Sequence, residues 1–224
     1  KIKIAIPFLK SGSIIIISSQ IPVGSISILE DYVFKNFSDR KIDFICAPEN
    51  LRLGQAIEVF MNPDRIIVGY RSELSKQKVE ALFLSISKNI EWMSIESAEG
   101  TKHAINAFLA TSIVFSNEIA SVCEMVGADA KEVEKGLKSE SRIGPRAYLS
   151  PGGPFAGGTL ARDVNFLLEI GNQNNINRDL LSSVFTSNEK HKKWIQNKIN
   201  LEFSVLKNKN ITIGELGTYL KQNV

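Results

Sequence analysis

The chain has 224 residues, of which 43% are hydrophobic and 23% are charged, and its formal net charge is +3. This length and composition are typical of a globular protein with one large domain or two small ones. The small net charge gives no support for nucleic acid or an anionic membrane as a partner. The longest apolar run, SIIIISS at 13–19, is far too short to span a membrane, and no signal peptide is visible.

The N-terminal part of the sequence alternates short β-branched runs with helix-like stretches. KIKIAI at 1–6 could be a strand or the end of a helix, and we favour the helix because no G-x-G-x-x-G turn follows it. Buried strands are predicted at 13–19, 41–50 and 64–70, and helices at 25–37, 55–61 and 75–87. This alternation predicts the α/β class, with a Rossmann-like parallel sheet.

After residue 96 the pattern becomes helical. The stretch 97–126 predicts one long helix that ends at Gly127, and Asp129 is the expected N-cap of the next helix. Two more helices are predicted at 162–172 and 178–199. Apolar residues of the long helix that we expect on buried faces are Ala104, Phe108, Ile119, Val122 and Met125.

The sequence predicts three segments. Residues 1–95 form part of a Rossmann-like domain, 96–205 form an all-helical central domain, and 206–224 begin a further domain. The last assignment rests on KNITIGELG at 209–217, which is strand-like and has no partner strands after it. We therefore expect the chain to be a portion of a longer protein.

Two cysteines, Cys46 and Cys123, lie in apolar stretches. They are too few for a disulfide framework, and their context favours buried free thiols over reactive ones. Together with the missing signal peptide, they predict a reducing, cytoplasmic location.

Three charged or polar residues could carry chemistry. Lys102 and Asn106 share a helix face, where they could stabilise an oxyanion and position a water, or form a solvated pair at a helix end. Glu49 follows a predicted strand, where ligand sites of α/β sheets collect. It could act as a general base, or as a charge at the start of a helix.

Other polar candidates are less specific. Arg142 lies in a loop and could bind phosphate or carboxylate, or be an ordinary surface arginine. His103 and His191 have no companion at metal-ligand spacing, so no metal is assigned. The basic run NEKHKKWIQNK at 188–198 is interpreted as the solvated face of a helix rather than a nucleic-acid site.

The stretch PFAGGTLARD at 154–163 predicts a loop that leads into a helix. Gly157 and Gly158 would let the backbone approach a ligand more closely than residues with side chains allow. Arg162 and Asp163 close the stretch. The position therefore indicates a ligand-facing loop.

Together these stretches resemble the UDP-glucose/GDP-mannose dehydrogenase family. The matching segments are SSQIPVGS at 18–25, APENLRLGQAIEVFMNPDRIIVG at 47–69, KHAINAFLATSIVFSNEIASVCEMVGAD at 102–129 and RIGPRAYLSPGGPFAGGTLARDV at 142–164. The resemblance implies an NAD-binding Rossmann domain, a helical central domain that makes a homodimer through helix 97–126, and a C-terminal nucleotide-binding domain. It also implies oxidation of a CH2OH group of a nucleotide sugar to a carboxylate, in two hydride transfers to NAD.

The resemblance implies a role for each residue that matches the family pattern. Lys102 and Asn106 would hold the oxyanion and the water. Asp163 would assist proton transfer and the later hydrolysis, in which Glu49 would also act. Arg142 would reach the nucleotide sugar of the partner subunit across the dimer.

Further residues would contact the ligands. Tyr148 and Phe155, with Gly157 and Gly158, would line the nucleotide-sugar loop. The residues expected on the cofactor side are Ser19, Gln20 and Arg162.

Three positions depart from the family pattern. Gln20 replaces a threonine, Leu53 replaces a second glutamate, and Thr159 replaces the nucleophilic cysteine. A thiol readily forms a thiolate that captures an aldehyde, whereas a hydroxyl does not unless a strong base lies beside it. The chain is therefore predicted to be a nucleotide-sugar dehydrogenase with an altered or lost second oxidation. The alternative is a non-catalytic dimerisation or nucleotide-sugar-binding module.

Overall fold

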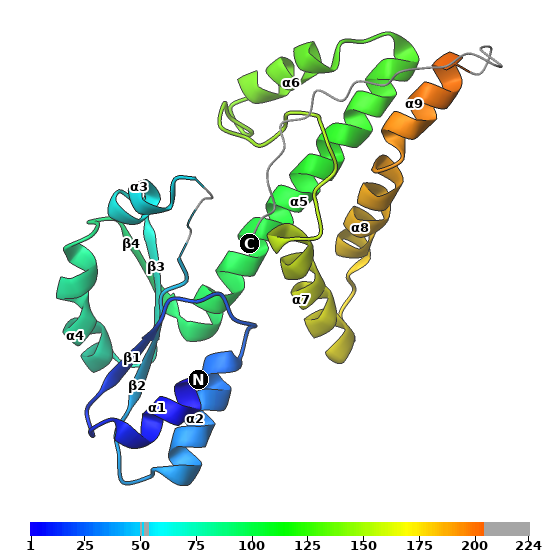
Figure 1. Cartoon of the computed structure of the whole chain (residues 1–224). Helices are drawn as coiled ribbons and strands as arrows, with labels where there is room; N and C mark the ends of the chain where they lie inside the picture. The colour runs from blue at the N-terminus through cyan, green and yellow to red at the C-terminus, as the bar shows by residue number, and fades with distance from the viewer. Residues whose placement is uncertain (50, 52–53, 204–224) are drawn as a thin grey trace.

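The computed structural model describes residues 1–49, 51 and 54–203 (Figure 1). A small sheet with helices on both faces is followed by a group of helices arranged along one long helix, α5 (Ile95–Val126). The predicted α/β class and the helical region after it are both confirmed. The predicted segment 206–224 and the departure at Leu53 lie outside the described residues.

The described part of the sheet contains four strands in the order β1-β2-β3-β4. Their bounds are β1 (Ile14–Ile17), β2 (Asp43–Cys46), β3 (Ile66–Tyr70) and β4 (Ile90–Ser94). β1 runs parallel to β2, and β3 runs parallel to β4. β2 and β3 are antiparallel, with Cys46 opposite Gly69, so the sheet is mixed and not wholly parallel as predicted. Hydrophobic periodicity reports which residues are buried and not the direction of the strand, which explains the difference.

Helices cover both faces of the sheet (Figure 1). They are α1 (Ile2–Ala5), the 3-10 helix η1 (Ile6–Phe8), α2 (Ser25–Asn36), α3 (Ala56–Met61) and α4 (Glu73–Leu84). Side chains of β2 alternate between the faces: Phe44 packs with η1 and α2, whereas Ile45 packs with α4. The helical interpretation of residues 1–6 is confirmed, because α1 covers Ile2–Ala5 and η1 begins at Ile6.

The start of α5 is held closely against the sheet by a glycine. A Cβ atom on Gly69 would lie 2.7 Å from the Cβ of Ala98 and 2.8 Å from the Cα of Ile95. No other residue fits this contact without a shift of the backbone. Gly69 therefore fixes the origin of α5, on which the candidate site is built.

In the described residues after α5, four shorter helices pack along it. Their bounds are α6 (Ala130–Ser139), α7 (Thr159–Gln173), α8 (Asp179–His191) and α9 (Trp194–Phe203). The predicted signals at the end of α5 are confirmed, because Gly127 is left-handed with φ of 73° and the Asp129 side chain caps α6. The single helix predicted at 178–199 is instead two helices, α8 and α9.

The core of this part lies between α5, α7 and α8. Small residues of α5, Ala107 and Ala110, let α7 approach closely, and Val164 of α7 and Val184 of α8 pack there. Both cysteines are buried and free, as predicted, and burial raises the pKa of the Cys46 thiol to about 12.

The bulky residues of α5 face away from this core. Phe108 is 70% exposed and Met125 is 85% exposed, and Ala104 and Val122 are exposed too. The prediction that these four residues lie on buried faces was therefore wrong for the single chain, whereas Ile119, predicted with them, is partly buried. Phe108 directly follows Ala107, so this exposed side borders the side that contacts α7.

α5 is long and apolar enough to cross a membrane by length and composition alone, a test that core helices of soluble proteins also pass. Its buried face carries several polar side chains that bond to other parts of the chain, among them Glu99, His103 and Asn106. This pattern fits a core helix better than a lipid-facing one, because intramembrane polar groups need such partners.

Candidate functional site

A buried polar group lies where α5, α7 and the loop after β1 meet. We call it the Asp163 cluster, and it consists of Gln20, His103, Asn106, Arg162 and Asp163. Asp163 is completely buried, and its Oδ2 accepts from Gln20 Nε2 at 2.6 Å and from Asn106 Nδ2. Its Oδ1 lies 3.2 Å from His103 Nδ1 and 3.5 Å from Arg162 Nε. A fully buried carboxylate is stable in such a site because every partner is a nitrogen that can donate.

Helical spacing explains how the sequence builds this group. Glu99, His103 and Asn106 are spaced by four and three residues, so they form one polar stripe on α5. Gln20 lies just beyond β1, and its Oε1 accepts from Arg162 Nη2 at 2.6 Å. The loop after β1 is thus joined to α7 across a separation of 142 residues.

Lys102 and Glu49 line a neighbouring cavity of about 120 Å³. Ser18 and Ala47, which directly follow β1 and β2, line it too, together with apolar side chains from α3 and α4. The carboxyl ends of parallel strands are the usual ligand-binding edge of an α/β sheet. The structure therefore brings two of the predicted catalytic residues together at this edge.

Burial lowers the pKa of Lys102, and the negative charges of Glu49 and Asp163 partly offset this effect. The Oε2 atom of Glu49 is buried, and it has no hydrogen-bond partner within the part of the chain that is described. A carboxylate oxygen with spare acceptor capacity beside a partly desolvated lysine could bind a hydroxyl group or a water molecule.

The twin-glycine loop is open to solvent. Gly157, Gly158 and Thr159 are exposed, and a Cβ atom on either glycine would meet no heavy atom within 4 Å. Thr159 is the first residue of α7, and Asp163 lies one helical turn further along the same face. A ligand could therefore approach the start of α7 without displacing a side chain.

The other predicted residues lie in different surroundings. Arg142 is 86% exposed on its side chain and pairs with Glu140, while Tyr148 and Ser19 are exposed. Phe155 is buried against Phe185 in the helical core, so its side chain does not line a surface loop.

Sequence reasoning missed the part that His103 plays. It was considered only as a metal ligand, and no group of three potential metal-binding side chains occurs in the described portion of the chain. The helical spacing from Glu99 to Asn106 was the available signal, because His103 completes that stripe.

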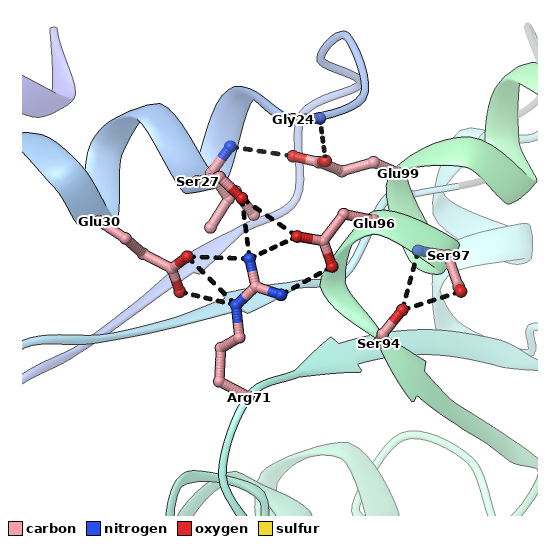
Figure 2. Close-up of polar contacts among 9 residues, drawn as sticks. Gly24, Ser27, Glu30, Arg71, Ser94, Glu96, Ser97 and Glu99 are labelled. Atoms are coloured by element: carbon pink, nitrogen blue, oxygen red, sulfur yellow. Dashed lines mark hydrogen bonds and ion pairs between the residues drawn. The ribbon is translucent and has the colours of Figure 1, made fainter.

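About two turns before His103 on α5, a second polar group lies near the surface (Figure 2). We call it the Arg71 cluster, and it consists of Ser27, Glu30, Arg71 and Glu96. The Arg71 guanidinium bonds both glutamates, and this pairing lowers the pKa of Glu96 to about 2. Nearby, the buried Glu99 carboxylate accepts from the backbone N–H groups of Gly24 and Ile26 at the start of α2.

Two family models match the chain. The model described as the NAD binding domain of the UDP-glucose/GDP-mannose dehydrogenase family matches residues 2–87. The model described as the central domain of the same family matches residues 96–190. Together the two matches account for most of the sequence.

Individual proteins are similar over the same region. The UDP-glucose 6-dehydrogenase TuaD of Bacillus subtilis is 35% identical over 216 residues, which are 96% of this chain and 46% of TuaD. The UDP-glucose 6-dehydrogenase of Rickettsia bellii is 34% identical over 205 residues, 89% of this chain and 46% of that protein. The chain thus spans about half the length of these relatives.

The fold is similar to solved structures. A UDP-glucose dehydrogenase from Pyrobaculum islandicum aligns with a TM-score of 0.78 and 24% identity, over 85% of this chain and 44% of its own. A UDP-D-ManNAc dehydrogenase from Pyrococcus horikoshii also aligns with a TM-score of 0.78, at 21% identity, over 92% of this chain and 48% of its own. At these identities the alignments show the fold alone.

Proposed function

The chain belongs to the UDP-glucose/GDP-mannose dehydrogenase family, and on that basis we propose that the protein oxidises the C6 hydroxyl of a nucleotide sugar with NAD as hydride acceptor. The observation that carries this proposal is the meeting of Lys102, Glu49 and the Asp163 cluster beside the carboxyl ends of β1 and β2. We also propose that the protein is cytoplasmic. Residues 1–95 and 96–205 are proposed to be separate domains.

The residues after β1 fit a cofactor at this edge. Ser19 is exposed directly beyond the strand, and Gln20 and Arg162 are hydrogen-bonded to each other beside it. We assign these three residues to the cofactor side. When bound, NAD supplies the acceptor for the hydride that leaves C6.

Lys102 is the proposed oxyanion-stabilising group. The substrate oxygen becomes more negative as it loses its proton, and an ammonium group in a desolvated site stabilises that charge more than it would in water. Asn106 and Asp163 would orient the water and assist proton transfer, and Glu49 would act in the hydrolysis.

The test is the reduction of NAD by the full-length protein with a panel of nucleotide sugars. We expect Lys102→Ala to lower kcat by about 10²- to 10³-fold, as removal of one oxyanion donor does. Lys35→Ala, which removes an exposed lysine of α2, is the matched control. Equal activity of the two variants would contradict the assignment.

Thr159 occupies the place of the family's nucleophilic cysteine, and we propose that the covalent route is therefore closed. A cysteine there would sit at the N-terminus of α7, where unpaired backbone N–H groups stabilise a thiolate. The threonine hydroxyl keeps its proton under these conditions. The protein would then stop at the aldehyde, oxidise the aldehyde hydrate directly, or act on another substrate.

The number of NADH formed per sugar tests this proposal. Thr159→Cys is compared with Thr159→Ser, which keeps a hydroxyl and changes only the methyl group. We expect a trapped covalent adduct in the cysteine variant alone. A covalent adduct with two NADH per sugar in the wild type would overturn the argument.

The alternative function is a non-catalytic nucleotide-sugar-binding or dimerisation module, which the absence of cysteine at position 159 favours. Thermal-shift titration separates the two, because a ligand stabilises only a state that it binds. Stabilisation by a nucleotide sugar without NADH formation would support the module.

We propose that the protein is a homodimer through α5. Phe108, Phe115 and Val122 repeat every seven residues and are exposed along one side of that helix, with Met125 at its end. A second copy would bury this apolar side. Arg142 would then be available to the partner's nucleotide sugar.

The oligomeric state tests this interface. Phe108→Glu combined with Val122→Glu should give a monomer in sedimentation analysis. Phe34→Glu removes an equally exposed aromatic from α2 and should leave the assembly unchanged. An unchanged dimer in the double variant would place the interface elsewhere.

A further inference from the structure

His103 is completely buried, one residue after Lys102 on α5. Its ring lies edge-on to Phe166 of α7 and bonds through both nitrogens. Nε2 is 2.9 Å from the carbonyl oxygen of Ile21, and Nδ1 is 3.2 Å from Oδ1 of Asp163. The ring therefore joins the loop after β1 to the buried carboxylate.

These two contacts fix where the ring needs protons. A carbonyl oxygen can only accept, so Nε2 carries a hydrogen. The Gln20 amide nitrogen also lies 3.4 Å from Nδ1, but it donates at 2.6 Å to Oδ2 of Asp163. In a neutral ring the lone pair of Nδ1 would still face Oδ1 at the shorter distance of 3.2 Å, and two acceptors repel each other. A proton between Nδ1 and Oδ1 removes this repulsion.

The surroundings of Asp163 decide which atom holds that proton. Oδ2 already accepts from Gln20 and Asn106, and the positive charges of Arg162 and Lys102 are nearby. Donated hydrogen bonds and nearby cations all favour the ionised carboxylate. The proton therefore belongs on the ring, and the ring is an imidazolium.

We infer that His103 is a positioning residue that, as an imidazolium, holds Asp163 ionised and fixed and ties the loop after β1 to α5. This inference rests on the proposed function, because it assigns Asp163 its orienting role there. The negative charges of Glu49 and Asp163 both act on Lys102, so a residue that fixes Asp163 also fixes one of the two anions near the lysine. His103 would therefore affect the rate of the reaction by holding Asp163 in position and not by contacting the substrate.

Ring ¹⁵N NMR tests the protonation state without any substrate. The spectra of His103→Gln and His191→Gln, each compared with the wild type, identify the signals of His103 in the full-length protein. At about pH 7 we expect both ring nitrogens of His103 to be protonated. In Asp163→Asn the amide can donate to the ring, so Nδ1 should lose its proton. An unprotonated Nδ1 in the wild type would overturn the inference.

Kinetics test the positioning role separately. We expect His103→Gln to lower kcat on the order of 10²-fold and to change KM much less, because the binding surface stays in place. His191→Gln is the control and should keep the wild-type kcat. A wild-type kcat in His103→Gln would reject the role. If the wild type oxidised no nucleotide sugar, the proposed function would fail, while the NMR result would still decide the protonation of His103.

Discussion

The first turns of α5 carry two polar clusters that differ in their access to water. In the Arg71 cluster, the side chains of Arg71 and Glu96 are 37% and 42% exposed. In the Asp163 cluster, His103 and Asp163 are fully buried. Solvent screens the first cluster, whereas in the second each donor and acceptor depends on its protein partner. Similar bonds should therefore contribute very different free energies of unfolding.

Two glutamates one turn apart show the same contrast. Arg71 lowers the pKa of Glu96 to about 2. Burial raises the pKa of Glu99, although the N–H groups of Gly24 and Ile26 oppose that rise. Two glutamates on one helix therefore have pKa values shifted in opposite directions, because the surroundings and not the residue type decide how easily a carboxyl group ionises.

The largest effect is expected for Asp163→Ala. This change leaves the buried donors of His103, Asn106 and Gln20 without their acceptor. Removal of one partner from a buried ion pair typically costs about 3–5 kcal/mol of the free energy of unfolding. Urea denaturation of the wild type and of Asp163→Ala at neutral pH measures this loss in the free energy of unfolding.

Asp163→Asn is the matched control, because it keeps the shape of the side chain. Its amide oxygen can still accept from Gln20, and its amide nitrogen can donate to a neutral His103 ring. We expect it to destabilise the protein less than Asp163→Ala does. Equal losses in the two variants would show that the carboxylate charge, and not the shape of the side chain or its amide-type hydrogen bonds, accounts for the stabilisation.

The next effect is expected for Glu99→Ala. The buried carboxylate accepts from Gly24 at 2.6 Å and from Ile26 at 3.0 Å, and both N–H groups would lose their partner. Unsatisfied buried donors cost about 1–3 kcal/mol. Because the pKa of Glu99 is raised, its native carboxyl holds a proton above the ordinary value of 4.5. Its contribution is therefore fully present below 4.5 and is lost as the pH rises above 4.5 through the raised pKa of the native carboxyl.

A pH series of urea denaturation checks this sign. The difference between wild type and Glu99→Ala should shrink from acidic to neutral pH. Glu91→Ala, on the exposed side of β4, is the control and should show no such trend. A difference that grows with pH would mean that the two N–H bonds outweigh burial.

A smaller effect is expected for Arg71→Ala, although its guanidinium makes more bonds than any other side chain in either cluster. Exposed ion pairs contribute about 0–1 kcal/mol, because water and salt screen them. Denaturation in low and high salt should show the loss decreasing with ionic strength. A loss as large as that of Asp163→Ala would remove the distinction between the clusters.

Much of the fold could be predicted because its signals are local. The strands at 13–19, 41–50 and 64–70 and the caps at Gly127 and Asp129 were found at their places. β4 was missed, since IEWMS contains the exposed Glu91 and Ser94 and three positions that are only partly buried, and so lacks a clear apolar run. The break between α8 and α9 was missed because neither proline nor glycine marks it.

The site could be predicted only in part. Lys102 and Glu49 were found from their spacing and their place after a strand, and they do line one cavity. The contacts of His103 come from residues 60 and 82 positions away, so no local pattern contains them. The apolar side of α5 was expected to be buried because periodicity cannot tell burial within a chain from burial by a partner.

The smallest expected effect concerns Glu96, and it sharpens the contrast with Glu99 most directly. The pKa of Glu96 falls from 4.5 to about 2, so its bond to Arg71 stabilises the native state at pH values above 4.5. This contribution should be lost as the pH falls from 4.5 toward 2, opposite in sign to that of Glu99. Because the side chain is 42% exposed, screening should limit the change to about half a kcal/mol. Glu96→Gln, compared with wild type across this range, should therefore be less stable at neutral pH and equally stable at the acidic end. A constant difference would mean that the glutamate acts through packing and not through its charge.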